Sequence, residues 1–284
     1  MRIMASHVQL SFQGTYKNCL FLEFYDKEEA MDKSSSEKPD YGNWVTKKFI
    51  YIPGAISILF WVTSFALTAL VAVAAVFLLV ALYFAYARYR FSQAGGNVQT
   101  QIEDLVLQHL NWDGKGKGLD IGCGNGPLTI KLAQKYAEAQ VTGIDYWGRQ
   151  WEYSKDVCER NAKIEGVAER VNFQKASASA LPFADGAFDV AVSNLVFHEV
   201  NGVKDKKDVI KEALRVIKKG GSFAFQDLFL WKRVYGEVDD LVETIRNWGI
   251  DQVDFVNTSD SKFISKGLRL PFMVGAIGIL HGRK

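Results

Sequence analysis

The sequence predicts an α/β domain built on a doubly wound, mostly parallel sheet, with a helical transmembrane segment before it. Beyond Arg90, short apolar runs alternate with amphipathic helical patterns, which is typical of strands joined by helical crossovers. Before Arg90, 39 consecutive residues from Phe49 to Ala87 contain no Asp, Glu, Lys, Arg or His. A membrane-spanning helix needs about 20 apolar residues, so this run argues strongly against a purely soluble protein.

Composition divides the 284 residues into three zones. Residues 1–48 are predicted to form a polar leader that is surface-exposed or partly disordered. Residues 49–90 form the predicted transmembrane segment, and residues 91–284 form one globular domain. The formal net charge of +2 argues against a nucleic-acid binder, and three cysteines without metal-ligand spacing predict a chain without a bound metal.

The apolar zone admits two topologies. One helix of this length would measure roughly 58 Å, about twice the thickness of the hydrocarbon core, so two helices of about 18 residues each fit better. Lys47 and Lys48 precede the zone, and Arg88 and Arg90 follow it. The positive-inside rule then places both flanks, and with them the globular domain, on the cytoplasmic side. One long tilted or interfacial helix remains the alternative, because no Gly, Pro or Asn marks a turn near the middle.

The globular domain shows seven extended segments. The predicted helices are at about 97–110, 127–137, 150–166, 204–219 and 236–248; the predicted strands are at 117–121, 140–145, 170–174, 187–193, 221–228, near 250–256, and at 273–281. No convincing helix separates the last two strands, which indicates an antiparallel pair at the end of the chain.

A glycine-rich loop follows the first predicted strand. It runs from Asp120 through Gly122, Gly124 and Gly126, at the junction of a strand and a helix. Glycines at such a junction allow a tight turn and the close approach of a ligand. A dinucleotide-binding loop needs a small residue three places after its second glycine, and that place holds Pro127.

Asp145 stands at the end of the second predicted strand. A carboxylate there can accept hydrogen bonds from both hydroxyl groups of a ribose. Alternatively, it caps the helix that follows. The nearby glycine loop favours the ribose interpretation.

These segments, with the block from Leu181-Pro182-Phe183 to Phe188-Asp189, resemble the class I S-adenosylmethionine-dependent methyltransferases. Within them the resemblance is to the small-molecule enzymes of the ubiquinone/menaquinone-biosynthesis and sterol type, and it covers roughly residues 97–230. It implies a Rossmann-like methyltransferase fold of seven strands, the last antiparallel, and S-adenosyl-L-methionine as cofactor.

The resemblance also implies roles for single residues. The loop from Gly122 to Gly126 would pass under the methionine part of the cofactor, with Asp120 near its ammonium group. Asp145 would hold the ribose, and Tyr146 would lie against the adenine. Other cofactor-facing positions are Ser177, Ala178 and Asn194; Ser177 stands where the family often has an aspartate.

Candidate groups for the acceptor follow the fourth and fifth strands. His198 is the candidate general base, since its unperturbed pKa is near neutrality; otherwise it is a packing residue. Gln226 and Asp227 are either polar residues facing the acceptor or ordinary core residues. Asn194 lacks the following Pro-Pro-Tyr/Phe of methyltransferases that act on nucleic-acid bases.

The sequence therefore predicts a membrane-anchored methyltransferase with a small, lipophilic acceptor, because anchoring raises the effective concentration of lipid-soluble substrates. The alternatives are a non-catalytic membrane scaffold, a nicotinamide-dependent oxidoreductase and a protein methyltransferase. The acceptor and the oligomeric state stay open.

Overall fold

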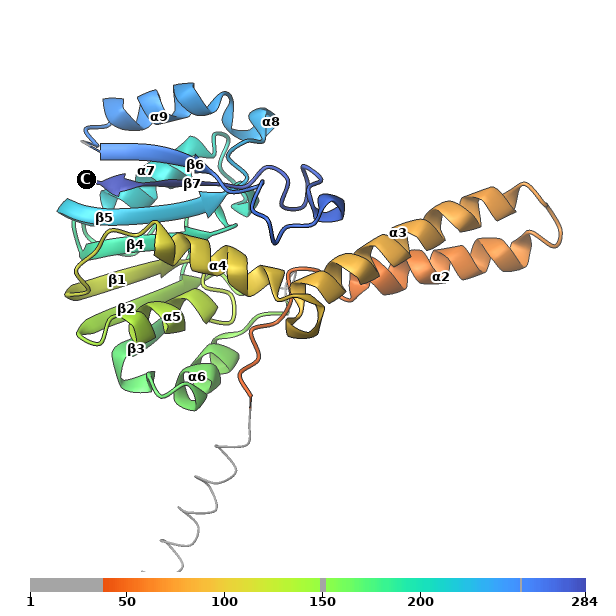
Figure 1. Ribbon diagram of the computed structural model, residues 1–284, viewed down its shortest axis with the longest axis horizontal. Coiled ribbons are helices and arrows are strands. Elements are labelled where there is room, and N and C mark those ends of the chain that lie inside the picture. Colours follow the sequence, from red (N-terminus) through yellow and green to blue (C-terminus); the bar gives the residue numbers. More distant parts are fainter. Residues whose placement is uncertain (1–37, 149–151, 251) are drawn as a thin grey trace, which may run out of the picture. The chain divides into compact units, whose positions relative to one another are not determined.

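One mixed sheet of seven strands organises the domain. The computed structural model describes residues 38–148, 152–250 and 252–284, and all contacts below lie within the compact unit Asp40–Lys284. The sheet order is β3-β2-β1-β4-β5-β7-β6 (Figure 1). The strands are β1 Gly116–Ile121, β2 Ala139–Asp145, β3 Val171–Lys175, β4 Phe188–Asn194, β5 Ile217–Asp227, β6 Gln252–Asn257 and β7 Gly278–Arg283. Strand β7 is antiparallel to both of its neighbours and the other pairs are parallel, which confirms the predicted sheet.

Helices cover both faces of this sheet. The first face carries α4 (Val98–Gln108), α5 (Pro127–Lys135) and α6 (Lys155–Ile164). The second carries α7 (Lys207–Arg215) and α9 (Val238–Asn247). Shorter elements are α8 Lys232–Tyr235, η1 Gln93–Gly95, η2 Ala168–Arg170, η3 Phe197–Glu199 and η4 Lys266–Leu268.

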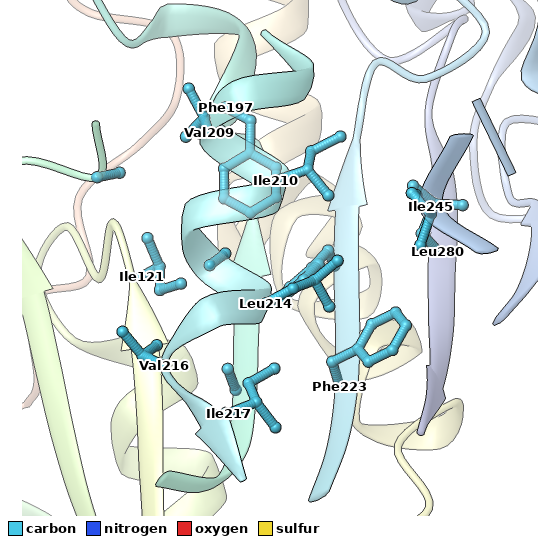
Figure 2. Packing of buried hydrophobic residues seen from close by; sticks show 14 of the residues in the cluster. Ile121, Phe197, Val209, Ile210, Leu214, Val216, Ile217, Phe223, Ile245 and Leu280 are labelled. Carbon is cyan, nitrogen blue, oxygen red and sulfur yellow. The ribbon is translucent and has the colours of Figure 1, made fainter. Parts of the chain in front are cut away.

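Successive side chains along each strand point to opposite faces of the sheet, so the hydrophobic core is divided between the two faces. On β5, Phe223 and Phe225 pack under α7, while Ala224 packs under α4 and α5. Figure 2 shows Ile210 and Leu214 of α7 on the same side of the sheet as Phe223. Because both faces are buried, the central strands are continuously apolar in sequence.

The last strand begins later than predicted. The sequence interpretation placed it at 273–281, whereas β7 is Gly278–Arg283. The preceding apolar residues Val274, Ala276 and Ile277 are buried in a loop rather than in the sheet. The hydrophobicity of these residues therefore predicted their burial correctly but did not predict that they form a loop.

Residues 48–91 form two helices, α2 (Lys48–Thr63) and α3 (Leu70–Phe91), that pack along one another (Figure 1). The Ser57 hydroxyl donates a hydrogen bond of 2.8 Å to the Ala74 carbonyl oxygen. Phe60 stacks on Phe77, with ring centroids 6.0 Å apart. Among the described residues, α3 is the one helix long and apolar enough to cross a membrane, and α2 is a shorter apolar helix.

The base of this hairpin belongs to the core of the domain. Ala87 and Phe91 at the end of α3 are buried with Val45, Ile102 and Leu268. The loop before β7 also contacts α3. The Tyr83 hydroxyl donates to the Gly267 carbonyl at 3.1 Å, and the Tyr86 and Ser265 hydroxyls lie 2.8 Å apart. These contacts fix the end of the hairpin that adjoins the sheet.

Truncation of Leu119 to alanine is expected to lower the free energy of unfolding by about 3 kcal/mol, because this β1 side chain is fully buried. Urea unfolding of the full-length protein in detergent measures the change. Leu270→Ala is the control at a partly exposed position and is expected to change stability by less than about 0.5 kcal/mol. Equal effects of the two substitutions would contradict the assigned core.

Candidate functional site

The loop between β1 and α5 turns through three glycines with positive φ, Gly122, Gly124 and Gly126, at 74°, 57° and 84°. A Cβ atom on Gly122 would lie 2.1 Å from a methyl carbon of Val196. On Gly124 it would face the ring of Tyr153 at 3.6 Å. Side chains are therefore excluded by backbone conformation and, at Gly122, by space as well.

Most amide groups of this loop are hydrogen-bonded within the protein. The N–H groups of Gly122 and Cys123 donate to the Ile144 carbonyl at 2.7 and 2.9 Å, and that of Gly126 donates to Cys123 at 2.7 Å. A dinucleotide-binding loop instead presents its amides to a pyrophosphate. The hydrogen bonding thus disfavours the oxidoreductase alternative on a ground independent of Pro127.

Asp145 connects the loop to β2. Its carboxylate accepts the Gly124 N–H at 2.9 Å and the Trp147 N–H at 2.7 Å. Burial raises the pKa of Asp145, although these hydrogen bonds oppose the shift. A carboxylate has about four acceptor positions, so its acceptor capacity is not exhausted by these backbone N–H groups. The carboxylate does not act as a side-chain N-cap of α6, because Ser154 does so by accepting the Val157 N–H.

Tyr146 and Asp120 lie at the same cavity in different settings. Tyr146 is 66% exposed and offers a ring face to a ligand. Asp120 is buried under the loop and accepts a hydrogen bond of 2.6 Å from the Thr129 hydroxyl. Burial raises the pKa of Asp120 to about 7 despite this bond, so a nearby cation would be favourable there.

The remaining predicted cofactor residues also line the cavity. The Ser177 hydroxyl lies 2.8 Å from that of Ser179, so it belongs to a local turn. Ala178 is buried, and the Asn194 side-chain oxygen accepts a hydrogen bond of 2.9 Å from Gln226. The structure brings eight of the nine predicted cofactor residues together at one cavity; the exception is Gly126, which is buried behind the loop next to Phe173 and Cys158. Contact of these residues with a cofactor stays a prediction.

His198 is held by a buried carboxylate. Its Nδ1 atom lies 2.7 Å from Oδ1 of Asp227, whose other oxygen accepts the Phe197 N–H at 2.8 Å. Burial alone lowers the pKa of His198, but the charge and hydrogen bond of Asp227 outweigh it and raise the pKa above the ordinary value. A neutral imidazole that donates Nδ1–H to Asp227 leaves Nε2 as a proton acceptor.

The interpretation of Gln226 and Asp227 as residues facing the acceptor is wrong. Both side chains are fully buried, and neither lines the cavity. Instead, each is hydrogen-bonded to a residue that does line the cavity, Gln226 to Asn194 and Asp227 to His198. The reason is register: β4 and β5 are parallel neighbours, with Asn194 opposite Gln226.

The segment 40–46 contributes Tyr41, Trp44, Val45 and Thr46 to the cavity lining, which the sequence did not reveal. The Asp40 carbonyl accepts hydrogen bonds from Asn125 at 3.2 Å and Asn161 at 2.9 Å. The Trp44 N–H donates to Gln99 at 3.2 Å. This segment, here called the strap, therefore connects the glycine loop directly to the start of α2. The rest of the predicted leader, residues 1–37, lies outside the described residues.

Glu103 is a second residue that sequence reasoning missed. It is buried on α4, lines the cavity and lies 3.0 Å from Lys131 Nζ. Burial raises the pKa of Glu103, and Lys131 opposes the shift. The available signal was its place beside Ile102 on the inward face of α4, where a charged residue is unusual.

The cavity measures about 1040 Å³ and has two kinds of wall. The glycine loop, Asp145 and His198 form a polar part of the lining, and side chains that mostly belong to the cluster at the hairpin base form an apolar part. The apolar wall is formed by Trp44, Val45, Phe49, Ile52, Phe84, Phe91, Leu228, Phe272, Met273 and Val274. This volume is at the upper end of the range for small-molecule sites, so a cofactor and a second molecule fit together.

Residues 119–225 match a methyltransferase domain. The matched region runs from β1 into β5 and contains the glycine loop, Asp145 and His198. S-adenosyl-L-methionine is the cofactor that this match implies. The glycine loop and the open acceptor positions of Asp145 fit that group.

Curated relatives agree over the same region. The 27-O-demethylrifamycin SV methyltransferase of Amycolatopsis mediterranei is 38% identical over 131 residues, which are 46% of this chain and 45% of that protein. The ubiquinone/menaquinone biosynthesis C-methyltransferase UbiE of Geotalea daltonii is 28% identical over 137 residues, 46% of this chain and 55% of that one. The chain spans about half the length of these relatives.

A solved structure shares the fold. The [4+2]-cyclase SpnF superposes with a TM-score of 0.51 at 22% identity, covering 66% of this chain and 82% of that chain. The likeness supports the sheet architecture and carries no argument about chemistry.

Asp145→Ala is expected to weaken S-adenosylmethionine binding by about 1.5–3 kcal/mol, because the hydrogen bonds to a charged acceptor are lost. Calorimetric titration of the full-length protein in detergent measures the affinity. Asp156→Ala, an exposed substitution on α6, is the matched control. Affinity that is equal in both variants and the wild type would show that the ribose site is assigned wrongly.

Proposed function

We propose that this chain is a membrane-anchored enzyme that transfers a methyl group from S-adenosylmethionine to a small, lipophilic acceptor. The observation that carries the proposal is one cavity that is lined both by the glycine loop and His198 and by apolar residues of the hairpin base. A polar ligand at one end and an apolar ligand at the other would meet inside it.

The cofactor, when bound, supplies an electrophilic methyl group. The chain's own residues bind and orient it: Asp145 takes the ribose hydroxyls, and Tyr146 offers an aromatic face to the adenine. Asp120 lies under the loop, where an ammonium group would lower its raised pKa. Positioning is the main contribution expected of the protein in such a displacement.

His198 is the proposed general base. Asp227 fixes the ring through Nδ1 and leaves Nε2 able to take a proton from the acceptor. Asp227 itself is buried away from the cavity, so it is a positioning residue. The relatives' names describe one O-linked and one C-linked product, and a base at this place would serve either chemistry.

The exposed surface of the hairpin supports anchoring in a membrane. Large apolar side chains face outward along both helices, and residues 49–87 contain no charge. Helix α3 is about 33 Å long and α2 about 24 Å, against a hydrocarbon core of about 30 Å. Exposure of this apolar surface to water is unfavourable, whereas the hydrocarbon core of a membrane accommodates it.

The orientation follows from the flanking charges. Lys47 precedes α2 and Lys48 is its first residue, while Arg88 and Arg90 lie in the last turn of α3. Both ends of the hairpin adjoin the same domain. We therefore place two crossings in the membrane, with the methyltransferase domain on the cytoplasmic side.

Methyl transfer is expected to rise with pH through a midpoint above 6.5, because the base must be neutral and Asp227 raises its pKa. The measurement is label transfer from S-adenosylmethionine to an organic extract of total membrane lipids. Asp227→Asn should move the midpoint to lower pH. Glu199→Gln, a substitution at the more exposed carboxylate 3.7 Å from Nε2, should move it in the same direction but less.

The control for these variants is their affinity for S-adenosylmethionine, which should match the wild type. An unchanged midpoint in both would exclude His198 as the titrating base. Transfer by none of the proteins, including the wild type, would favour the non-catalytic scaffold. Label recovered only in protein would favour a protein methyltransferase.

Anchoring predicts that the full-length protein floats with lipid vesicles after carbonate extraction. The double variant Val76→Arg/Leu79→Arg should lose this behaviour, because each arginine costs about 2.5–3.5 kcal/mol at the centre of a membrane helix. Val76→Ala/Leu79→Ala is the matched control at the same exposed positions. A wild-type protein that stays in the aqueous fraction would contradict the anchor.

A further inference from the structure

The apolar end of the cavity opens at the base of the hairpin. Phe49 and Ile52 of α2 line the cavity and are also 47% and 57% exposed. Phe272, in the loop before β7, lines it and is 55% exposed. Side chains that face the interior and the outside together mark an opening, and we name these three residues, with Phe84 and Met273, the mouth.

The mouth lies where the hairpin meets the domain. Helix α2 begins at Lys48, so Phe49 and Ile52 fall within its first turn and a half, roughly 6 Å along the axis. Exposed Lys47 and Lys48 stand beside them. In an anchored protein with this orientation, the mouth is level with the headgroups and the first carbons of the acyl chains.

The two sides of the mouth are tied together. Phe49 of α2 stacks on Phe84 of α3, with centroids 5.1 Å apart. Tyr83 of α3 meets Phe272 edge-on at 6.4 Å and donates its hydroxyl hydrogen to Gly267. The opening is therefore built jointly by the hairpin and the loop between β6 and β7. Exposed Phe272 in this loop is unfavourable in water but suits contact with lipid.

The cavity changes in polarity from the mouth inward. Asp120, Glu103 and Asp145 are carboxylates at the inner end, and His198 stands with them. At the mouth, Lys48 is the ionisable residue among aromatic and aliphatic side chains. A fully polar acceptor would leave the aromatic side chains in contact with water. A fully apolar acceptor would cover the carboxylates of the cavity without offering them a hydrogen-bond partner.

We infer that the acceptor is an amphiphilic lipid of the membrane, which enters sideways through the mouth. Its apolar tail stays between Phe49, Ile52 and Phe272, and its polar, nucleophilic end reaches His198. This inference rests on the proposed function and deepens it by naming the class of acceptor and its route.

Photochemical labelling tests the route independently of turnover. The full-length protein is placed in phosphatidylcholine vesicles that contain phosphatidylcholine with a diazirine in one acyl chain, and labelled peptides are mapped by mass spectrometry. The wild type should be labelled on the hairpin surface and also at Phe91 or Val274, which are buried and line the cavity. S-adenosylmethionine affinity is measured on the same preparation.

Two tryptophan substitutions provide a matched pair. Ile52→Trp fills the mouth, whereas Ile58→Trp changes a similarly exposed residue of the same helix that does not line the cavity. The first should lower labelling inside the cavity about tenfold, and methyl transfer to the lipid extract with it, while the second changes neither. Both should keep the labelling of the hairpin surface.

The outcomes separate the two proposals. Cavity labelling that is absent, or equal in both tryptophan variants, overturns the lateral route while S-adenosylmethionine binding leaves the proposed function standing. A wild type that binds no S-adenosylmethionine, or whose hairpin takes up no label, overturns the proposed function itself.

Discussion

The attachment of the glycine loop to the end of β2 is the constraint on which the site depends. Ile144 and Asp145 accept hydrogen bonds from three successive amides, Gly122 to Gly124. This fixes the loop, uses its amides internally and leaves the outer edge of the Asp145 carboxylate to face the cavity. One set of hydrogen bonds thus holds Asp145 at the cavity, as the proposed ribose site requires, and occupies amides that a phosphate site would need.

Other elements are arranged around this attachment. The strap is hydrogen-bonded to Asn125 in the glycine loop and to Asn161 in α6, and it continues directly into α2. The guanidinium of Arg88, near the end of α3, donates to Val45 in the strap. The hairpin is therefore bonded to the same backbone that lines the cavity beside the glycine loop. The proposed anchor and the proposed cofactor site thus share a structural element.

Local patterns in the sequence predicted the parts that local chemistry determines. Residue types and nearby turns were enough to find the glycine loop, Asp145 at the end of β2 and His198 after β4. The partner of His198 could not be predicted in this way, because Asp227 is 29 residues away and meets His198 only through the register of β4 and β5. Glu103 was hidden for a related reason, because its burial depends on the packing of α4 against α5. The strap and the loop before β7 were missed because irregular segments have no periodicity to read.

A crystal structure of the full chain grown from a lipidic mesophase with S-adenosylhomocysteine, the product form of the cofactor, would test the central claim most directly. The account predicts the adenosyl group between Asp145 and Tyr146, and acyl density that passes Phe49 and Phe272 towards His198. Nucleoside density elsewhere, or a mouth that faces solvent with the hairpin outside the lipid, would contradict it.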